Sequence, residues 1–541
     1  MFINFSDIPG HQNLFLDYLY EFDNVEKYFR YNFRDTNSFS SLFQKISESE
    51  RADKKSVVNA INQFYSAYKP SKKTKVNIEL LGKDKTVAVV TGQQLGILGG
   101  PLYTFYKTIT AIKLASSLKE KYDDYNFVPV FWLEGDDHDF EEVTELNLIN
   151  QKNELQKFIY NDNKPEDFNR GNIGRLAFNE GIENFIQEVK SELRETEFSK
   201  NVFELFEDSY KSGNTFKKAF SDLIFNLFDE EGLIIFDPQQ NEIKNLLKPI
   251  FKKELSNFEV HANEVVKISA DLEEVYHSQV KVKPINLFYS ENNGRYSIEP
   301  EDDLFRLKGK RQKFTLIELL DEIENYPDKF SANVLLRPIT QDYLLPTGFY
   351  VAGPSEISYF AQVMPLYNKF GISEPVIYPR SSVTILEKNI KGVLEKYELN
   401  IEDIFVEEKL LNNRVLNQVA DIRIDDLLHE YEHQIAKAMD NIKEKLFGID
   451  PTLKDLSDKT YQKIKQGLDT LKSKAENAQE RKHDVALRQI KKASISLYPN
   501  NNLQERELNW LYFANKYGMD IIKWIFDEVA INKFEHQVIE L

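Results

Sequence analysis

Hydrophobic residues are distributed along this chain in two distinct patterns. Short runs that are apolar at nearly every position occupy residues 87–91, 128–133, 233–236, 334–336 and 376–378, and helical periodicity fills the segments between them. Runs of this length without polar alternation are typical of strands buried on both faces of a parallel sheet. The alternation of such strands with helices predicts an α/β fold whose sheet is mostly parallel.

Two polar stretches interrupt the strand–helix alternation. Residues 148–218 contain helical pieces, and residues 258–330 carry short strand signals around the turn Asn292-Asn293-Gly294. We interpret both stretches as insertions into one core. The expected parts are therefore 1–147, 219–257 and 331–390 for the core, 148–218 and 258–330 for the insertions, and 391–541 for a C-terminal helical domain.

The last third of the chain has the periodicity of long amphipathic helices. Residues 425–447 place apolar side chains on one helical face, and Gly448-Ile449-Asp450-Pro451 interrupts the pattern. Two such helices around a short break predict an antiparallel helical hairpin. In the second helix apolar residues recur at alternating steps of four and three, the repeat of a coiled coil: Ile464, Leu468, Leu471, Ala475, Ala478 and Val485.

Composition narrows the classes of function. A chain of 541 residues exceeds the usual size of one compact domain, and its net charge of −18 argues against general affinity for nucleic acid or anionic membranes. The absence of cysteine excludes disulfides, thiolate metal sites and a cysteine nucleophile. No apolar run approaches the ~20 residues of a membrane-spanning helix, and no secretory signal is evident. We therefore expect a cytoplasmic protein.

The first candidate site follows the apolar run at 87–91. Glycines 92, 96, 99 and 100 lead to Pro101, which begins a helical pattern that extends to about Tyr122. Glycines let backbone N–H groups approach a ligand, and a helix N-terminus favours anions. The loop lacks the G-x-G-x-x-G and Walker spacings, so a tight turn with close packing is the alternative interpretation. The residues expected to bind substrate here are Thr91, Gly92, Gln93, Gln94, Gly99, Gly100, Tyr103 and Lys107.

The second candidate site follows the apolar run at 128–133 and reads Asp136-Asp137-His138-Asp139. Histidine titrates near neutral pH and is a credible general base, and the carboxylates suit a substrate ammonium or Mg²⁺. We expect His138, Asp136 and Asp139 to be catalytic, with Trp132 and Asp137 in contact with substrate. The alternative is an acidic turn in which Asp139 caps the next helix. Because open α/β sheets bind ligands at the carboxyl ends of their strands, this cluster should meet the glycine loop at one cleft.

A third group of polar residues lies between positions 337 and 380. Gly353-Pro354-Ser355 resembles the start of a helix, which favours anions. Guanidinium groups match carboxylate or phosphate bidentately, although a structural salt bridge explains each arginine equally well. The residues expected to bind substrate are Arg337, Gln341, Asp342, Ser355, Glu356 and Arg380.

The segment His429-Glu430-Tyr431-Glu432-His433 fits the H-E-x-x-H pattern of zinc peptidases. It lies in the predicted coiled-coil helix and lacks a third ligand at short downstream spacing. Two solvated histidines are therefore the preferred interpretation, and we predict no metal site. A zinc metallopeptidase and a non-catalytic coiled-coil scaffold are the alternative functions.

Taken together, the motifs resemble one family, the bacillithiol-biosynthesis cysteine-adding enzymes. The resemblance extends almost from end to end and includes Gln504, Glu505, Arg506 and Asn509 of the C-terminal QER-x-x-N. In this chain Asp136 stands where we expect the family to have Glu more often. The matching segments, in order, are TGQQ-x-x-x-x-GGPLYT-x-YK, FW-x-x-GDDHD, SANVLLRP-x-x-QD, LPT, GP-x-E-x-x-YFAQ and PR.

The resemblance implies a Rossmann-like core with connecting insertions and a C-terminal antiparallel coiled coil that forms a homodimer. It also implies a ligase that joins cysteine to glucosaminyl-malate in the last step of bacillithiol synthesis. ADP binding is associated with the family, so ATP or ADP with Mg²⁺ is the expected cofactor. Because amide formation needs an activated carboxyl, we expect an acyl phosphate or adenylate of cysteine. His138 would then take the proton of the attacking amine, and Arg337 or Arg380 would bind the malate carboxylates.

Overall fold

The computed structural model describes residues 1–420 and 423–541, which divide into two compact units. The first unit comprises Met1–Ile385 and Leu503–Ile539, and the second comprises Leu386–Asn502 and Glu540–Leu541. Residues 503–539 therefore belong to the first compact unit, although they lie within the expected C-terminal part 391–541.

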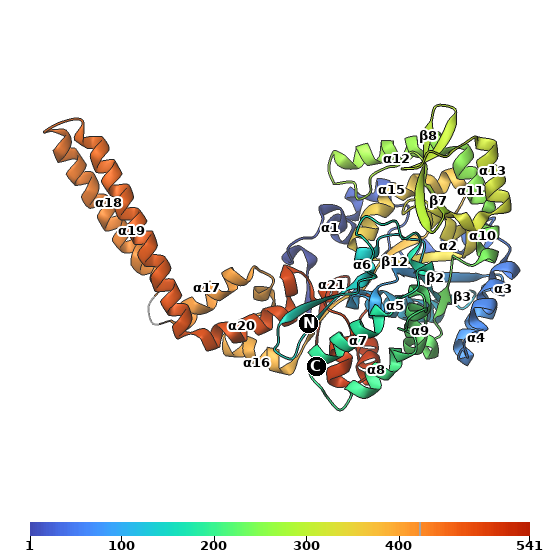
Figure 1. Cartoon of the computed structure of the whole chain (residues 1–541), viewed down its shortest axis with the longest axis horizontal. Helices are drawn as coiled ribbons and strands as arrows, with labels where there is room; N and C mark the ends of the chain where they lie inside the picture. The colour runs from blue at the N-terminus through green and yellow to red at the C-terminus, as the bar shows by residue number, and fades with distance from the viewer. Residues whose placement is uncertain (421–422) are drawn as a thin grey trace. The chain divides into compact units, whose positions relative to one another are not determined.

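The centre of the first unit is a parallel sheet of five strands (Figure 1). Its strands lie in the order β13-β12-β2-β3-β6, and almost all of their residues are buried, as the continuous apolar runs predicted. β2 and β3 pair from Thr86 opposite Asn126 to Gln94 opposite Glu134. The bounds are β2 Thr86–Gln94, β3 Asn126–Glu134, β6 Ile234–Phe236, β12 Thr347–Ala352 and β13 Val376–Pro379.

Two crossover helices give this sheet its doubly wound topology. Helix α5 (Leu102–Lys121) connects β2 to β3, and α15 (Pro354–Phe370) connects β12 to β13 on the other side of β2. Right-handed crossovers that run in opposite directions place their helices on opposite faces of the sheet. The strand order reverses between β2 and β12, and such sheets bind ligands at the carboxyl end of this position.

One predicted strand is wrong and one strand was missed. Residues 334–336 form a turn, because the side-chain oxygen of Asn333 accepts the backbone N–H groups of Leu335 and Leu336 over 3.0 Å each. The chain then enters α14 (Arg337–Leu344), and the fourth core strand is β12. Gly348 in β12 breaks the apolar pattern, yet a side chain there would lie 2.3 Å from Val87.

The remaining elements of the first unit surround the central sheet. The second insertion forms an antiparallel sheet in the order β10-β9-β8-β7-β11, and β1, β15 and β14 form a sheet near the termini. The N-terminal helices are α1 Asn13–Tyr20, α2 Phe39–Glu48, α3 Lys54–Tyr65 and α4 Lys72–Leu81. The first insertion and the helices around it are α6 Phe140–Thr144, β4 Glu145–Ile149, β5 Leu155–Ile159, α7 Gly181–Glu192, α8 Ser199–Glu207, α9 Phe216–Phe228, α10 Asn241–Leu246 and α11 Lys248–Ser256. The second insertion contains α12 Phe258–Glu273, β7 Leu287–Glu291, β8 Gly294–Glu301, β9 Leu304–Leu307, β10 Lys313–Phe314, α13 Leu316–Asn325 and β11 Phe330–Ala332. The terminal elements are β1 Phe2–Ile3, β14 Ser382–Leu386, α21 Gln504–Glu507, α22 Leu511–Tyr517, α23 Asp520–Glu528 and β15 His536–Glu540.

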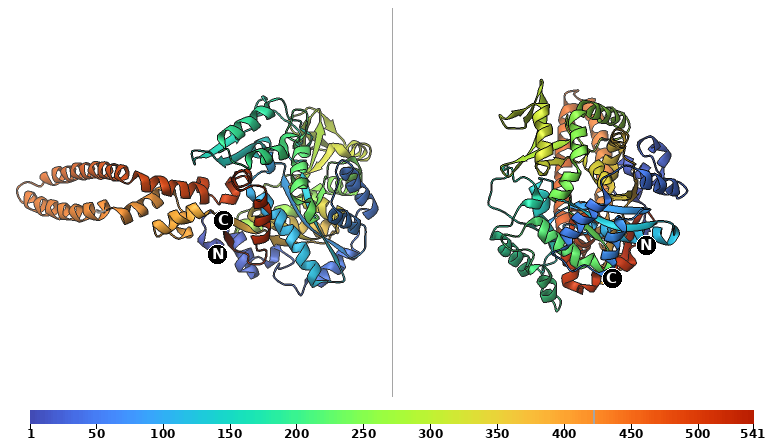
Figure 2. Two further views of the ribbon diagram at one scale, coloured as in Figure 1. Left: turned by 90° about the horizontal axis from the view of Figure 1, so that it is seen from below. Right: turned by 90° about the vertical axis from the view of Figure 1, so that its right-hand side faces the viewer.

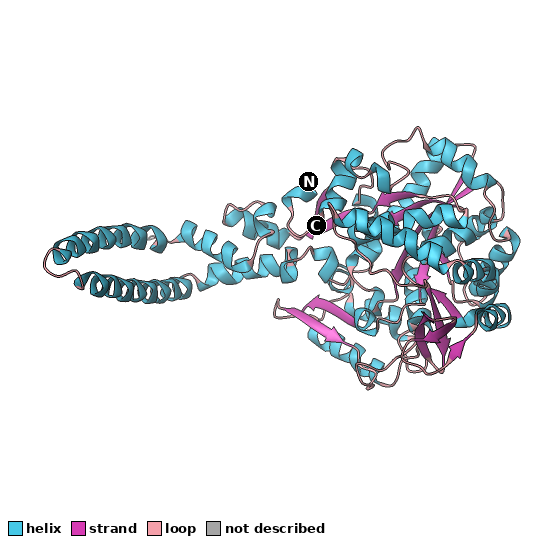
Figure 3. Cartoon of the chain, turned by 90° about the horizontal axis from the view of Figure 1, so that it is seen from above, coloured by secondary structure: helices cyan, strands magenta, loops and turns pink. Residues whose placement is uncertain are grey.

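The second unit is built from helices (Figure 3), and the predicted antiparallel hairpin is confirmed. Helices α18 (Ile424–Phe447) and α19 (Leu453–Lys482) lie side by side in Figures 1 and 2. An ion pair of 2.6 Å between Lys472 and Asp425 joins them. Although both helices are long, no helix within the described residues is apolar enough over its length to cross a membrane. The other helices of this unit are α16 Lys388–Lys396, α17 Glu408–Val419 and α20 Asp484–Leu497.

The predicted seam of the second hairpin helix is correct only in part. Ile464, Leu468 and Ala475 are partly covered, whereas Leu471 is 55% exposed and Ala478 is also exposed. Val485, which is 60% exposed, lies beyond this helix in α20. A helix with 3.6 residues per turn drifts by about 20° per heptad relative to a 3.5-residue repeat. The partly covered positions of α19 therefore continue through Lys472, Ala475 and Gln479 and leave Leu471 exposed.

Candidate active site

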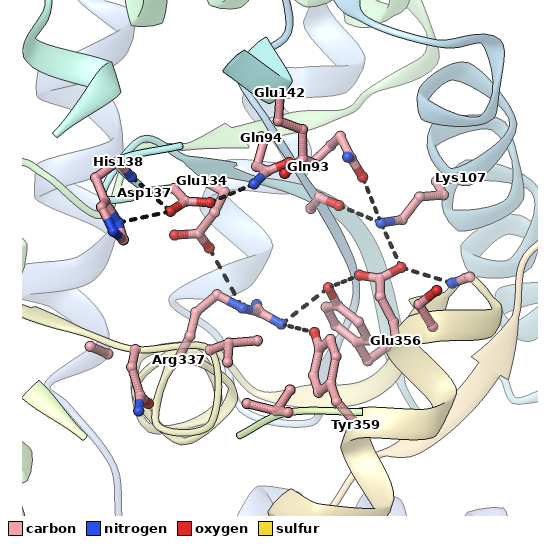
Figure 4. Close-up of a pocket in the computed structure, with 18 of the residues that line it drawn as sticks. Gln93, Gln94, Lys107, Glu134, Asp137, His138, Glu142, Arg337, Glu356 and Tyr359 are labelled. Atoms are coloured by element: carbon pink, nitrogen blue, oxygen red, sulfur yellow. Dashed lines mark hydrogen bonds and ion pairs between the residues drawn. The ribbon is translucent and has the colours of Figure 1, made fainter. Parts of the chain in front are cut away.

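A cavity of about 490 Å³ opens at the carboxyl ends of the central strands, a volume typical of small-molecule sites. Its wall includes the last residues of β2 and β3 and residues that follow β3, β12 and β13. Figure 4 shows how these side chains converge. Of the residues expected from the sequence, the cavity is lined by Gly92, Gln93, Gln94, Tyr103, Lys107, Asp137, His138, Arg337, Ser355, Glu356 and Arg380.

The end of β2 and the segment that follows β3 meet in this cavity, which confirms the expected convergence for Gly92, Gln93 and Gln94 but not for the later glycines. The amide of Gln94 donates a hydrogen bond of 2.5 Å to Asp137 (Figure 4). Burial alone would raise the pKa of Asp137, but the backbone N–H of His138, the amide of Gln94 and the charge of Arg295 hold it well below its usual range. Asp137 is therefore an anion that joins the two segments.

The glycine loop itself does not face the cavity as an anion site. The buried residues 95–100 turn away from it, and Gly99 and Gly100 are absent from its lining. Asn509 donates to the carbonyl oxygens of Leu98 and Gly100 over 3.0 and 2.7 Å, so the C-terminal segment covers the loop. The backbone N–H groups of the loop find partners within the protein: Gly96 to Gln94, Gly99 to Gly96, Gly100 to Ile97 and Leu102 to Leu508. The expectation that these N–H groups bind an anionic ligand is wrong, and the alternative interpretation of a tight turn with close packing holds.

Two of the three expected catalytic residues also lie outside the cavity lining. Asp136 is buried and pairs with Lys244 over 2.5 Å, and Asn172 and Gln239 donate to its other oxygen. Burial would raise the pKa of Asp136, but Lys244 lowers it, so Asp136 is an internal anion without capacity for substrate ammonium or Mg²⁺. Asp139 caps α6 by accepting the backbone N–H of Glu142 over 3.3 Å, as the alternative interpretation proposed.

Four further residues that we expected to bind substrate do not line the cavity. Their polar atoms or rings contact other residues of the protein. Thr91 donates to the carbonyl oxygen of Val351, and Trp132 stacks on Phe236. Gln341 is fully buried and accepts from Arg337, and Asp342 accepts from Tyr367 and Gln341. Burial raises the pKa of Asp342 to about 6.

One wall of the cavity is organised around the ion pair between Lys107 and Glu356. Their charged atoms are 2.7 Å apart, and Lys107 also donates to Gln93 and to the carbonyl oxygen of Gly92 (Figure 4). Burial would raise the pKa of Glu356, but Lys107 and the backbone N–H of Gly353 lower it. Glu356 is therefore an anion that joins the start of α15 to α5.

The two expected arginines have structural contacts as well as places in the cavity wall. Arg337 donates to the hydroxyls of Tyr350 and Tyr359, and its Nε lies 3.5 Å from Glu134 (Figure 4). Arg380 pairs with the buried Glu505 over 2.7 Å. Part of each guanidinium is therefore committed to the fold.

Glu134 is a cavity residue that our sequence analysis missed. It ends β3, accepts from the indole N–H of Trp132, and approaches Arg337. Burial and the neighbouring charges of Asp136 and Asp137 outweigh the opposite effect of Arg337 and raise its pKa to about 7. The sequence could have indicated Glu134, because it directly follows the apolar run at 128–133.

Arg295 is a second missed residue. It reaches the cavity from β8 of the second insertion, and its Nη1 lies 2.9 Å from Nδ1 of His138. Nothing in the sequence relates these two residues, which are 157 positions apart. Other missed lining residues are Glu142, Lys281, Lys283, Phe288, Tyr350, Tyr359 and Arg506.

The two histidines of the H-E-x-x-H segment do not belong to the cavity. His429 and His433 are exposed positions of α18, and neither lines the cavity. Across the described ranges 1–420 and 423–541, no group of three or more His, Cys, Asp or Glu side chains is arranged to hold a metal ion.

Comparison with known proteins identifies the family. Residues 1–381 match the family model "Bacillithiol biosynthesis BshC, N-terminal Rossmann-like domain", and residues 383–541 match "Bacillithiol biosynthesis BshC, C-terminal coiled-coil domain". Relatives named "Putative cysteine ligase BshC" occur in Salinibacter ruber (33% identical, covering 97% of this chain and 96% of the relative) and Chloroherpeton thalassium (34%, 95% and 93%). A third, from Natranaerobius thermophilus, is 33% identical over 100% of this chain and 99% of the relative. The chain belongs to the BshC family of bacillithiol biosynthesis.

Proposed function

We propose that this protein is a ligase that joins the carboxyl group of cysteine to the amine of glucosaminyl-malate. The observation that carries this proposal is the charge of the cavity. Among the described residues that line it, seven lysine or arginine side chains face four carboxylates, although the whole chain has a net charge of −18. A cationic cavity in an acidic protein favours an anionic small molecule, and the malate group carries two carboxylates.

The cations and carboxylates of the cavity suit different parts of the substrates. Arg337 and Arg380 lie on the wall near Glu356, and we assign the malate carboxylates to this region because guanidinium groups bind carboxylates bidentately. Asp137 is an anion beside His138, and the carboxyl groups of Glu134 and Glu142 line the same region. We assign the amino groups of cysteine and glucosamine to this second region.

The proposed reaction forms one carbon–nitrogen bond. The glucosamine nitrogen attacks the activated carboxyl carbon of cysteine, the activating group leaves with the carboxyl oxygen, and the nitrogen releases a proton to water. The cavity would hold both reactants in contact, and well-oriented groups can contribute about 7–11 kcal/mol to such a step.

ATP with Mg²⁺ is our proposal for the activating reagent, on chemical grounds. The glycine loop does not fit a nucleotide phosphate, because its N–H groups donate within the protein. We therefore derive no step through a nucleotide at this loop.

The decisive experiment is incubation of the purified protein with glucosaminyl-malate and cysteine, with and without ATP and Mg²⁺, followed by mass spectrometry. We expect a product with the mass of both substrates less one water. The absence of this product in both reactions, from protein that binds glucosaminyl-malate, would contradict the ligase. The scaffold alternative predicts no thermal shift with glucosaminyl-malate, cysteine or ATP.

We also propose that the chain forms a homodimer through the coiled coil. Support comes from large apolar side chains on the outer surface of α18 and α19, of which Leu427, Tyr431, Ile442 and Leu471 are 42–55% exposed. Light scattering should give twice the chain mass of 63.3 kDa. A variant with Tyr431→Glu and Leu471→Glu should give the monomer mass, and a monomeric wild-type protein would contradict the proposal.

A further inference from the structure

Arg295 is held rigidly in the cavity wall. Its side chain is 4% exposed, and its guanidinium lies 3.7 Å from the centre of the Phe288 ring. Nε donates to the hydroxyl of Ser331 over 3.0 Å, and Nη2 donates to the carbonyl oxygen of Ala332 over 2.9 Å. These contacts orient the remaining nitrogen, Nη1, towards His138.

The contact with Arg295 determines which ring nitrogen of His138 carries hydrogen. Nη1 and Nδ1 are 2.9 Å apart, and a guanidinium has donors but no acceptor. Nδ1 is therefore the acceptor and has no hydrogen, because two N–H groups that face each other at this distance repel. In a neutral imidazole the hydrogen then lies on Nε2.

Asp137 is the competing partner of the same nitrogen. Its Oδ1 lies 3.3 Å from Nδ1 of His138 and accepts the backbone N–H of His138 over 2.7 Å, while Oδ2 accepts from Gln94. If Nδ1–H donated to Asp137, Nε2 would be free to act as a base. The shorter contact with Arg295 opposes that arrangement. The Phe288 ring, which packs against the ring of His138, also contacts Lys283: the Nζ of Lys283 lies 4.6 Å from the centre of the Phe288 ring.

We propose that Arg295 is a positioning residue that holds His138 as the neutral Nε2–H tautomer, so that His138 presents a hydrogen-bond donor to the cavity. His138 is half-exposed and lines the cavity, so this donor can bind a carboxylate or acyl oxygen of a substrate. The role of His138 as donor to a reacting oxygen, in place of proton acceptor, rests on the proposed ligase function. The tautomer does not depend on that function.

Nuclear magnetic resonance of ¹⁵N-histidine-labelled protein tests the tautomer directly. A His138→Gln variant identifies the signals of His138 among those of the eight histidines. We expect the Nε2–H form in the wild type at neutral pH. Arg295→Met should shift the ring towards the Nδ1–H form bonded to Asp137, whereas Arg295→Lys, which keeps a cationic donor, should restore the Nε2–H form.

Two further variants make the test independent of folding defects at Arg295. Asp137→Asn should leave the tautomer unchanged, because Arg295 sets it. Arg306→Met is the matched control, since this arginine of β9 pairs with Glu299 and Glu301 and does not line the cavity.

An Nδ1–H form in the wild type, or a tautomer that changes in Asp137→Asn but not in Arg295→Met, would overturn the proposal. If Arg295→Met does not fold, the wild-type and Asp137→Asn spectra decide. No substrate is needed, so a failure of amide formation would count against the ligase and not against the tautomer.

Discussion

The segments that follow β2 and β3 occupy equivalent positions on neighbouring strands, yet they have different roles. The segment after β3 places Asp137 and His138 in the cavity, and both contribute polar side chains to its wall. The glycine loop after β2 turns away beyond Gln94, and its backbone polar groups donate to and accept from the protein. A glycine-rich strand–loop–helix segment can therefore serve close packing as well as anion binding, and the partners of its N–H groups distinguish the two.

The difference depends on what covers each segment. Trp510 and Asn509 of the C-terminal segment donate to carbonyl oxygens of the glycine loop, including a bond of 2.8 Å from the indole to Leu98. By contrast, the region around His138 borders the open cavity and receives Arg295 from an insertion. The C-terminal QER-x-x-N motif thus supports the core, although it is some 400 residues from the loop that it covers.

The largest expected effect is the loss of the cover over the glycine loop. Trp510→Ala removes a fully buried side chain and should lower the free energy of unfolding by about 3–5 kcal/mol. Urea unfolding followed by circular dichroism measures this change. Trp524→Ala, at a partly exposed tryptophan of α23, is the matched control and should cost clearly less. Equal losses would contradict the covering role of Trp510.

Substitutions in the acidic–histidine segment should change the rate of amide formation. His138→Ala should slow amide formation about 10²–10³-fold, the usual cost of losing a hydrogen-bond donor to a reacting oxygen. His138→Gln retains a donor amide near the position of Nε2 and should keep more activity than His138→Ala. Product formation by mass spectrometry measures both. Equal rates in the two variants would argue against a donor role for His138.

Substitutions in the glycine loop should change the stability of the protein and leave substrate binding unchanged. At Gly99 φ is +87°, and a side chain would lie 2.9 Å from Leu223 and 3.2 Å from Phe105. Gly99→Ala should therefore lower the free energy of unfolding by about 1–3 kcal/mol. Calorimetric titration with glucosaminyl-malate should show an unchanged dissociation constant. A tenfold weaker affinity in folded Gly99→Ala protein would restore the anion-binding interpretation of the loop.

The smallest expected effect concerns the ionisation of Glu134. Its pKa in the folded protein is raised to about 7 from the ordinary 4.5, so its stabilising contribution is full below pH 4.5 and declines as pH rises through 7. The wild type should lose at most about 2.5 kcal/mol of unfolding free energy relative to Glu134→Gln between pH 5 and 8. Thermal unfolding of both proteins at these pH values measures the difference. A difference that is constant with pH would mean that Glu134 is not protonated near neutrality.

Strong local patterns made much of the fold predictable. Apolar runs identified β2, β3, β6 and β13, and the helical periodicity identified both hairpin helices. β12 was missed because Gly348 interrupts its pattern, and residues 334–336 were assigned to a strand although Asn333 turns them. At Gly348 close contact with Val87 of a distant strand outweighed the local propensity. At residues 334–336 the side-chain hydrogen bonds of Asn333 did so.

The sequence by itself determined the carboxyl ends of β2, β3 and β13, three of the four strands from which the cavity is built, because the carboxyl ends of neighbouring parallel strands must meet at one edge of a sheet. It could not decide which polar groups remain available there. Tertiary structure paired Asp136 with Lys244, buried the glycine loop under Asn509, and placed Arg295 against His138. Each of these outcomes is a contact between segments far apart in the chain, and desolvated polar groups take whichever partner the fold brings within hydrogen-bonding distance.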